Sequence, residues 1–216
     1  THDIAVAYKL NLAFYEALGV DGWCDLEATI AYIRSRGNTF IIADAKRGDI
    51  GNTARKYAEA FYDKLGVDAV TIAPYMGRDS VEPFLGRPGK WGVVLGVTSN
   101  DGARDLQFLT VDGGEQRLFE RVMEKAASWG SVEDTMFVVG ATRAEVLAQA
   151  RTAAPHHFFL VPGVGAQGGD LKAVLDAGLT ADGGLLINSS RGILYAGKDA
   201  DAIPAARRAA LHMRDV

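Results

Sequence analysis

The sequence predicts an α/β fold of repeated β/α units around a parallel sheet, and three observations support this. Short runs rich in Val, Ile and Phe alternate with longer amphipathic segments. Most of these runs are apolar throughout, as is typical of strands that are covered on both faces. Polar residues and glycines gather where the runs end, which is the edge at which parallel α/β proteins place their sites.

Seven apolar runs are expected to form the strands. They cover residues 4–10, 40–46, 69–75, 91–99, 136–142, 158–165 and 184–190. A doubly wound sheet tolerates seven strands, whereas a closed barrel of this kind has eight. The seven runs therefore predict either an open sheet or a barrel whose first β/α unit would precede Thr1.

A helix is expected between the first two runs because hydrophobic residues recur there at spacings of three and four, up to Gly37. Cys24 lies in this segment between two stripe residues and is interpreted as a structural, packed thiol. As the single cysteine it cannot form an internal disulfide, which is typical of a reducing cytosol. The stripe consists of Trp23, Leu26, Ile30 and Ile33.

Further helices are expected after the later runs. The segment 54–65 repeats the helical spacing of apolar residues and is followed by Gly66. Thr142 and Glu145 have the spacing of a capping box, which predicts a helix over 143–150.

Composition indicates one domain over residues 1–216 and a small-molecule ligand. The chain has 216 residues and a formal net charge of −4, with basic residues scattered along it. Neither nucleic acid nor a membrane is therefore expected as a partner, and no signal peptide is evident. We expect a cytoplasmic protein.

Two loops predict a phosphate site. The segment 161–170, VPGVGAQGGD, follows an apolar run and opens a helix, so its glycines let backbone N–H groups approach an anion. The next run ends in INSSRGI, whose Arg191 can bind two phosphate oxygens. Gln167 adds an amide donor. Either loop alone is equally compatible with a purely structural turn, but two on successive strands favour phosphate.

The stretch DAKRGDIGNTA, residues 44 to 54, predicts a second, charged site. Asp44 and Lys46 are two apart on a strand and are expected to point to the same side, with Asp49 in the following turn. Lys9 ends the preceding run and would lie beside them if consecutive strands pair. A surface charge cluster is the alternative, but charges on so apolar a strand need partners and usually have a function.

Residues 47 to 49 also spell the adhesion tripeptide Arg-Gly-Asp. That interpretation is disfavoured, because the tripeptide follows a buried strand in a chain with no export signal.

The strings DAKRGDIGNTA, APYMG, VTSN, VPGVGAQGGD and NSSRGI occur in this order, and the chain thereby resembles the orotidine 5'-phosphate decarboxylases of the bacterial DAKRGDIG subgroup. The resemblance extends from about Ala5 to Gly197. It implies a (β/α)8 barrel and a homodimer with active sites shared between subunits. It also implies decarboxylation of orotidine 5'-phosphate to uridine 5'-phosphate (UMP) without a cofactor or metal.

The resemblance further implies roles for single residues. Lys46 would deliver the proton, Asp44 would face the substrate carboxylate, and Lys9 would contact the ribose. Asp49 would reach the neighbouring subunit's site. The remaining substrate-binding residues implied are Ile50 and Thr53 across the interface, Ser99 at the pyrimidine, and Pro162, Gln167 and Arg191 at the phosphate.

In the family the first strand ends in an aspartate that binds the ribose, and no residue here matches it. We therefore expect either that an N-terminal segment precedes Thr1 or that the chain is impaired. Two other functions stay open. One is a magnesium-dependent sugar-phosphate enzyme of the same barrel superfamily, such as a hexulose-phosphate synthase. The other is a phosphate-binding module without catalysis.

Overall fold

The computed structural model describes residues 1–140, 143–163 and 171–215. Its seven strands form one sheet in which each strand pairs in parallel with the next along the chain. Each strand overlaps the apolar run that predicted it. The strands are β1 (Ala7–Asn11), β2 (Phe40–Arg47), β3 (Ala69–Ile72), β4 (Trp91–Val97), β5 (Thr135–Val139), β6 (Phe158–Pro162) and β7 (Leu185–Asn188).

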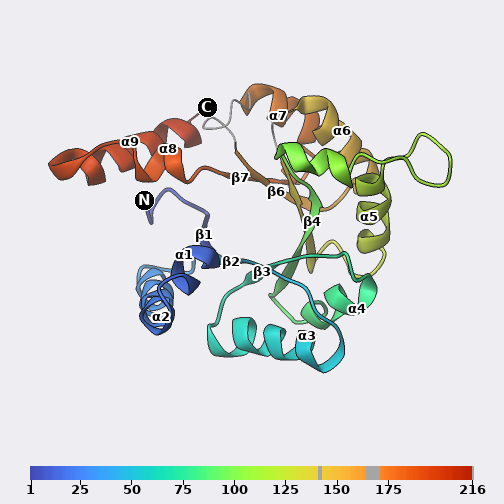
Figure 1. Cartoon of the computed structure of the whole chain (residues 1–216). Coiled ribbons are helices and arrows are strands. Elements are labelled where there is room, and N and C mark those ends of the chain that lie inside the picture. Colours follow the sequence, from blue (N-terminus) through green and yellow to red (C-terminus); the bar gives the residue numbers. More distant parts are fainter. Residues whose placement is uncertain (141–142, 164–170, 216) are drawn as a thin grey trace.

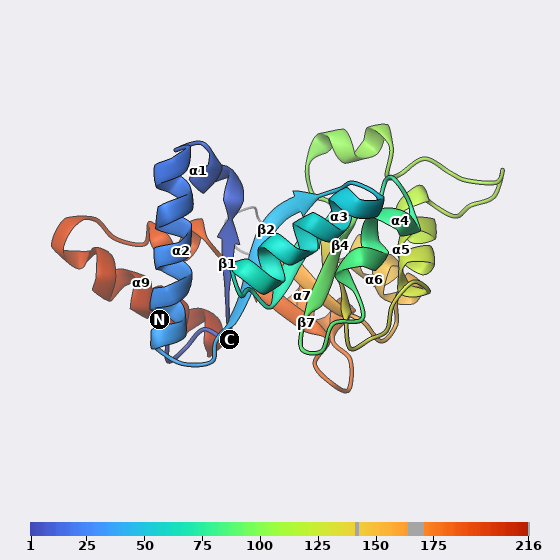
Figure 2. The ribbon, with the colours of Figure 1, turned by 90° about the horizontal axis from the view of Figure 1, so that it is seen from below.

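The sheet curls into a nearly closed barrel with helices on its outer face (Figure 1; Figure 2). Alternate strand residues face opposite sides of a sheet. One set, which includes Ile42, Val93 and Leu160, forms a small apolar cluster made of strand residues alone. The neighbouring positions, such as Ile41 and Val94, belong to the larger core shared with the helices. The barrel interior and the sheet–helix layer are therefore separate apolar clusters, which confirms the predicted barrel.

The barrel is open on one side. Within the described residues β1 and β7 do not pair with each other, so the sheet has two edges. A cleft of about 390 Å³ lies between these edges and is lined by Lys9 at the end of β1 and by Asn188, Ser189 and Ser190 at the end of β7. The cleft is within the usual size range of ligand pockets.

The helices follow the strands as predicted. Within the described parts of the chain, none is long and apolar enough to cross a bilayer. The helices are α1 (Leu12–Glu16), α2 (Val20–Ser35), α3 (Gly51–Ala58), which continues as a π-helix over Glu59–Lys64, α4 (Arg78–Val81), α5 (Leu118–Ala127), α6 (Ala144–Ala153), α7 (Leu171–Gly178), α8 (Arg191–Leu194) and α9 (Ala202–Arg214). Short 3-10 turns occur at Glu82–Phe84, Asp101–Asp105 and Asp199–Asp201.

The prediction for the first stripe is only partly confirmed. Leu26, Ile30 and Ile33 are buried, but Trp23 is 39% exposed and Cys24 is exposed. Leu26, Ile30 and Ile33 lie at positions i, i+4 and i+7 and share one helix face, whereas Cys24 is two residues before Leu26, about 200° away around the helix. The interpretation of Cys24 as a packed thiol was therefore wrong.

The start of α6 also differs from its prediction. The helix begins at Ala144, with Arg143 as the N-cap residue and no side-chain capping bond. Thr142, the expected cap, lies outside the described residues, so its role stays a prediction. The helix extends three residues beyond the predicted end because the apolar face continues to the buried Ala150 and Ala154.

Arg151 fixes the ends of several elements at the amino end of the barrel. Its guanidinium donates five hydrogen bonds to the carbonyl oxygens of Ala154, His157, Gly178 and Gly184, and it lies 3.7 Å from the centre of the Phe159 ring. Burial lowers the pKa of Arg151 to about 10. The cation is thus held by backbone dipoles and a ring face instead of a carboxylate.

Stability is expected to fall at mildly acidic pH because of His157. This side chain is 7% exposed, and neither ring nitrogen has a hydrogen-bond partner among the described residues. Burial, with smaller contributions from His156 and Arg151, lowers the pKa of His157 below its ordinary value. A lowered folded-state pKa means that the unfolded chain binds the proton first, so stability is complete above about pH 6.5 and declines as the pH falls below it.

Urea unfolding at pH 7.5 and pH 5.5 measures this effect. In His157→Leu the difference between the urea midpoints at the two pH values should be smaller than in wild type. His156→Gln, which changes the exposed neighbour, is the control and should show the wild-type difference. If the urea midpoint of His157→Leu depends on pH as strongly as that of wild type, His157 is not the source of the pH dependence.

Candidate active site

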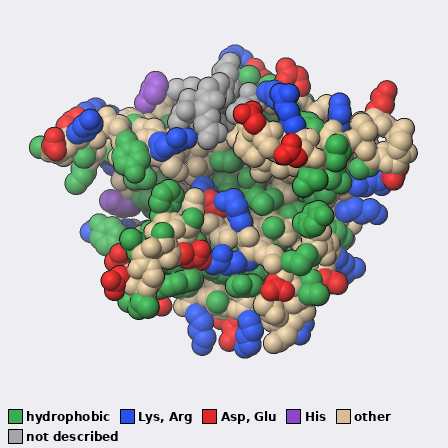
Figure 3. All heavy atoms as spheres, in the orientation of Figure 1, with side chains coloured by type: hydrophobic (Ala, Val, Ile, Leu, Met, Phe, Trp, Pro, Cys, Tyr) green, Lys and Arg blue, Asp and Glu red, His purple; other side chains and the backbone are tan. Residues whose placement is uncertain are grey.

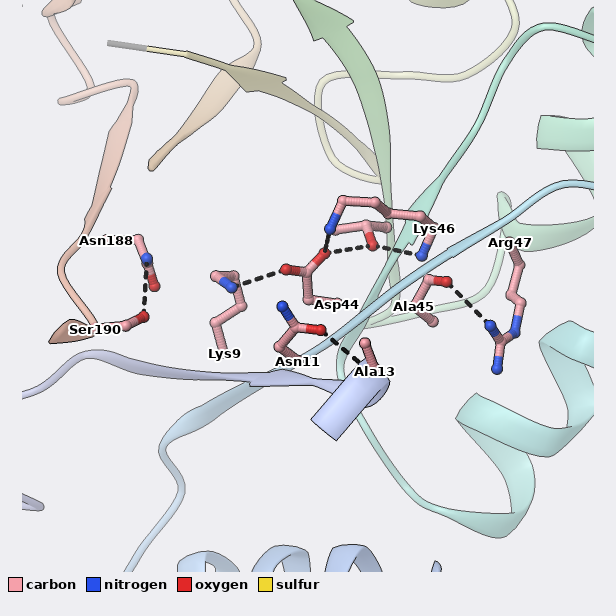
Figure 4. A network of polar contacts seen from close by, with 10 residues as sticks. Lys9, Asn11, Ala13, Asp44, Ala45, Lys46, Arg47, Asn188 and Ser190 are labelled. Carbon is pink, nitrogen blue, oxygen red and sulfur yellow. Dashed lines mark hydrogen bonds and ion pairs between the residues drawn. The ribbon is translucent and has the colours of Figure 1, made fainter. Parts of the chain in front are cut away.

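A lysine on each side holds one buried aspartate at the carboxyl end of the barrel. β1 and β2 pair with Asn11 opposite Asp44, which places Lys9 beside that carboxylate. Lys9 Nζ lies 2.8 Å from Asp44 Oδ2, and Lys46 Nζ lies 2.5 Å from Asp44 Oδ1 (Figure 4). Asp44 is only 8% exposed. The predicted contact of Lys9, Asp44 and Lys46 is therefore present, and these three residues form a charged array.

Asp44 and Lys46 lie in an irregular part of β2. Their contact therefore does not arise from the regular alternation of side chains along a strand. Ala43 pairs with Val70 of β3, but Arg47 already pairs with Ile72, so the ladder contains a bulge. Bulges bend a strand and redirect its side chains, often next to active sites. Lys46 lies within this bulge and has a φ of 48°, in the left-handed region that residues other than glycine rarely adopt.

Thr71 of β3 takes part in the array although its sequence context gave no signal for it. Its hydroxyl donates to Asp44 Oδ1 at 3.0 Å and accepts a hydrogen bond from the Lys46 backbone N–H at 2.9 Å. A threonine within an apolar strand is typical of β-structure. Its position, two residues after the interior-facing Ala69, is the feature that would have indicated it.

The charges around Asp44 keep it ionised. Burial works to raise the pKa of the Asp44 carboxyl, but the ammonium groups of Lys9 and Lys46 outweigh it and hold that pKa below its ordinary value. Two cations around one anion leave a net positive charge in the array. Such an arrangement can stabilise negative charge that develops on a bound ligand.

Arg47 anchors the end of β2. Its guanidinium contacts Glu16 of α1, donates to the Ala45 carbonyl at 3.1 Å and lies 5.5 Å from the centres of the Tyr57 and Phe61 rings. Because the guanidinium is engaged by the protein itself, the side chain is poorly placed for an adhesion receptor.

Asp49 does not join the array. Within the described residues its carboxylate contacts its own chain neighbour, since the Ile50 N–H donates to Asp49 Oδ1 at 2.8 Å. Ile50 caps α3 and is 51% exposed, and Thr53 in the first turn of α3 is also exposed. Within the described residues, the structure thus brings together three of the four predicted charged residues, and Asp49 is not among them.

Ser99 follows β4 at the same end of the barrel and is half-buried. Its loop lies tightly against the end of β5, because a Cβ on Gly140 would come within 2.7 Å of the Ser99 backbone nitrogen. A side chain at position 140 would therefore displace Ser99.

The strands that precede the two predicted phosphate loops end side by side. Pro162 at the end of β6 pairs with Asn188 at the end of β7, and Gly163 has a φ of 92°. Arg191 is exposed and begins α8, with no side-chain partner among the described residues. Gln167 lies outside the described residues.

One broad face of the molecule has basic and acidic side chains at its centre, with hydrophobic side chains around them (Figure 3). No group of three or more His, Cys, Asp or Glu residues suited to a metal ion occurs within residues 1–140, 143–163 and 171–215. A parallel barrel with a charged array at the carboxyl ends of its strands is the arrangement of (β/α)-barrel enzymes.

Comparison with known proteins specifies the family. Residues 1–206 match the model of the Orotidine 5'-phosphate decarboxylase / HUMPS family, and the chain belongs to this family. It is 50% identical over 216 residues to the orotidine 5'-phosphate decarboxylase of Bacteroides fragilis, covering 100% of this chain and 78% of the relative. It is 55% identical over 197 residues to that of Christiangramia forsetii, covering 91% and 72%.

Solved structures of similar proteins point to the same family. The OMP decarboxylase of Leishmania donovani superimposes with a TM-score of 0.86 and 42% identity, covering 100% of this chain and 84% of that one. The UMP synthase of the same organism gives a TM-score of 0.88 and 46% identity, covering 99% of this chain and 47% of that one. The predicted family is thereby confirmed.

Proposed function

We propose that this chain is a cytoplasmic carboxy-lyase that converts orotidine 5'-phosphate to UMP in de novo pyrimidine biosynthesis, without a metal ion or organic cofactor. The observation that carries the proposal is the Lys9–Asp44–Lys46 array, in a chain about half identical to proteins named for this reaction. Adding orotidine 5'-phosphate to the protein should lower the ultraviolet absorbance of the pyrimidine. An unchanged spectrum and no UMP would overturn the proposal.

The Lys9–Asp44–Lys46 array suits the loss of CO2 from C6 of the pyrimidine. Loss of CO2 from C6 leaves an electron pair in the plane of the ring, which the ring carbonyls do not delocalise. A preorganised cation close to C6 stabilises this charge as it develops. The Lys46 ammonium, which is held in place by its ion pair with Asp44, then donates the proton to C6. Asp44 also repels the substrate carboxylate, which leaves as neutral CO2.

A magnesium-dependent sugar-phosphate enzyme is the nearest rival. In such an enzyme the carboxylates would bind the metal, but here the Lys9 ammonium already occupies Asp44 Oδ2. Decarboxylation should therefore continue undiminished in EDTA, whereas activity that EDTA removes and Mg²⁺ restores would favour the rival.

Arg191→Ala is expected to lower kcat/KM for orotidine 5'-phosphate by on the order of 10², with kcat itself reduced. Phosphate binding energy far from C6 can drive loop closure and exclusion of water, so its loss affects turnover as well as affinity. Steady-state kinetics measure both constants. Arg208→Ala is the control and should leave both constants unchanged. It removes an exposed arginine of α9 that forms an ion pair with Asp201. A raised KM with an unaltered kcat would contradict the role in closure.

We also propose a homodimer in which Asp49, Ile50 and Thr53 reach the partner's site. The loops after β2 and β3 expose large apolar side chains, with Ile50 51%, Tyr75 90% and Met76 47% exposed. Exposed apolar patches often mark interaction surfaces. Asp49 also lies apart from its own subunit's array.

Mixing two inactive proteins tests the shared site. Lys46→Ala and Asp49→Ala subunits should together recover about a quarter of wild-type activity, because half the dimers are hybrids and each hybrid has one complete site. Lys46→Ala mixed with Asp44→Ala should recover none, since these two residues act within one subunit. Hybrid dimers seen by native mass spectrometry without recovered activity would contradict sharing.

A further inference from the structure

The bulge in β2 is centred on one residue of β3. Ala43 pairs with Val70 and Arg47 with Ile72. Three residues of β2, from Asp44 to Lys46, therefore stand opposite Thr71 alone. Both members of the array that come from β2 lie in this irregular segment.

Thr71 uses its hydroxyl in both directions. A threonine hydroxyl has one proton to donate and lone pairs that accept. Here the proton goes to Asp44 Oδ1 and a lone pair accepts from the Lys46 N–H. Thr71 is 0% exposed, so no water has access to take over these bonds. One oxygen atom thus connects the carboxylate of one functional residue to the backbone of the other.

The Lys46 backbone needs such a constraint. Its φ of 48° is disfavoured for a residue with a side chain, and a conformation of this kind persists where the surroundings fix it. The N–H of Lys46 is bonded to Thr71, while the neighbouring Arg47 carbonyl accepts from the Ala73 N–H at 2.8 Å. β3 and the residue that follows it, Ala73, therefore hold the bulge on both sides of the Lys46–Arg47 peptide.

Strand formation alone gives no reason for a hydroxyl at this position. The other residues of β3 are Ala69, Val70 and Ile72, and all are fully buried. Valine has nearly the shape of threonine and an equal preference for strands. The polar atom is thus placed where its contacts are with the array and not with the apolar core.

We propose that Thr71 is a positioning residue, whose hydroxyl fixes the left-handed backbone of Lys46 and the Asp44 carboxylate so that the Lys46 ammonium is aimed at the reacting carbon. The activity part of this inference rests on the proposed decarboxylase function. The positioning itself is a property of the folded chain and can be measured without turnover.

Three variants test the inference. Thr71→Val removes the hydroxyl and should lower kcat by about 10- to 100-fold, the scale of a small misplacement of a reacting group, with KM within about threefold of wild type. Thr71→Ser keeps the hydroxyl and should retain kcat within about threefold. Thr135→Val is the control, because Thr135 is also 0% exposed and its hydroxyl donates to Asp134, away from the array. Its kcat should not change.

Hydrogen exchange at the Lys46 amide gives a readout that is independent of catalysis. In NMR experiments this amide should exchange at least about tenfold faster in the Thr71→Val protein than in wild type, and at a wild-type rate in the Thr71→Ser and Thr135→Val proteins. An inactive wild type would refute the proposed function and leave the exchange prediction standing. Unchanged kcat and unchanged exchange in Thr71→Val, or an equal loss in Thr71→Ser, would overturn the role of Thr71.

Discussion

Lys46→Ala is expected to lose decarboxylation by a factor on the order of 10⁴ or more while the protein still folds and binds UMP. The variant lacks both the cation that stabilises charge at C6 and the acid that protonates it. Folding should survive, because the Lys46 side chain is 49% exposed and Asp44 keeps its ion pair with Lys9. The phosphate loops at β6 and β7 are untouched, so UMP binding should be retained.

Single-turnover absorbance measurements and UMP titration calorimetry separate these effects. Lys125→Ala, which removes an exposed lysine at the end of α5, is the matched control and should be fully active. Lys46→Arg should remain nearly inactive, because a guanidinium keeps the charge but is a very weak acid. Residual turnover above about a hundredth of wild type in Lys46→Ala would mean that another group supplies the proton.

The large features of the fold were predictable because they depend on composition along short windows. Fully apolar runs indicated buried parallel strands, and consecutive pairing then placed Lys9 beside Asp44. The pairing of Pro162 with Asn188, at the strand ends that precede the two predicted phosphate loops, followed from the same rule. These inferences needed no knowledge of individual contacts.

Details that depend on register were not predictable. The bulge opposite Thr71 arises from how β2 and β3 pair, and the alternation of apolar residues does not reveal it. The exposure of Cys24 does not depend on register and was predictable, because the angle between Cys24 and the buried stripe of α2 follows from the sequence spacing. Asp49 was grouped with the array because spacing along the chain does not show where a turn directs its side chains.

Asp44→Asn is expected to reduce both turnover and stability, which distinguishes it from Lys46→Ala. Turnover should fall by at least on the order of 10³, because Lys46 loses the ion-pair partner that aims its ammonium. Stability should fall by about 3 kcal/mol, since removing one partner of a buried ion pair leaves the other unpaired. The Lys9 side chain is only 11% exposed and has little access to water.

The double variant Lys9→Met with Asp44→Asn isolates the cause of the stability loss. Removing the second charge should restore part of the unfolding free energy in urea, while activity stays lost. The pH dependence should change as well: the lowered pKa of Asp44 contributes stability above its unfolded value of about 3.9, and this contribution is lost as the pH falls. Asp44→Asn should therefore be less sensitive to acid between about pH 5 and pH 3. Equal unfolding free energies for wild type and Asp44→Asn at pH 7 would mean that the Lys9 pair contributes no net stability, and the array would then be maintained for catalysis alone.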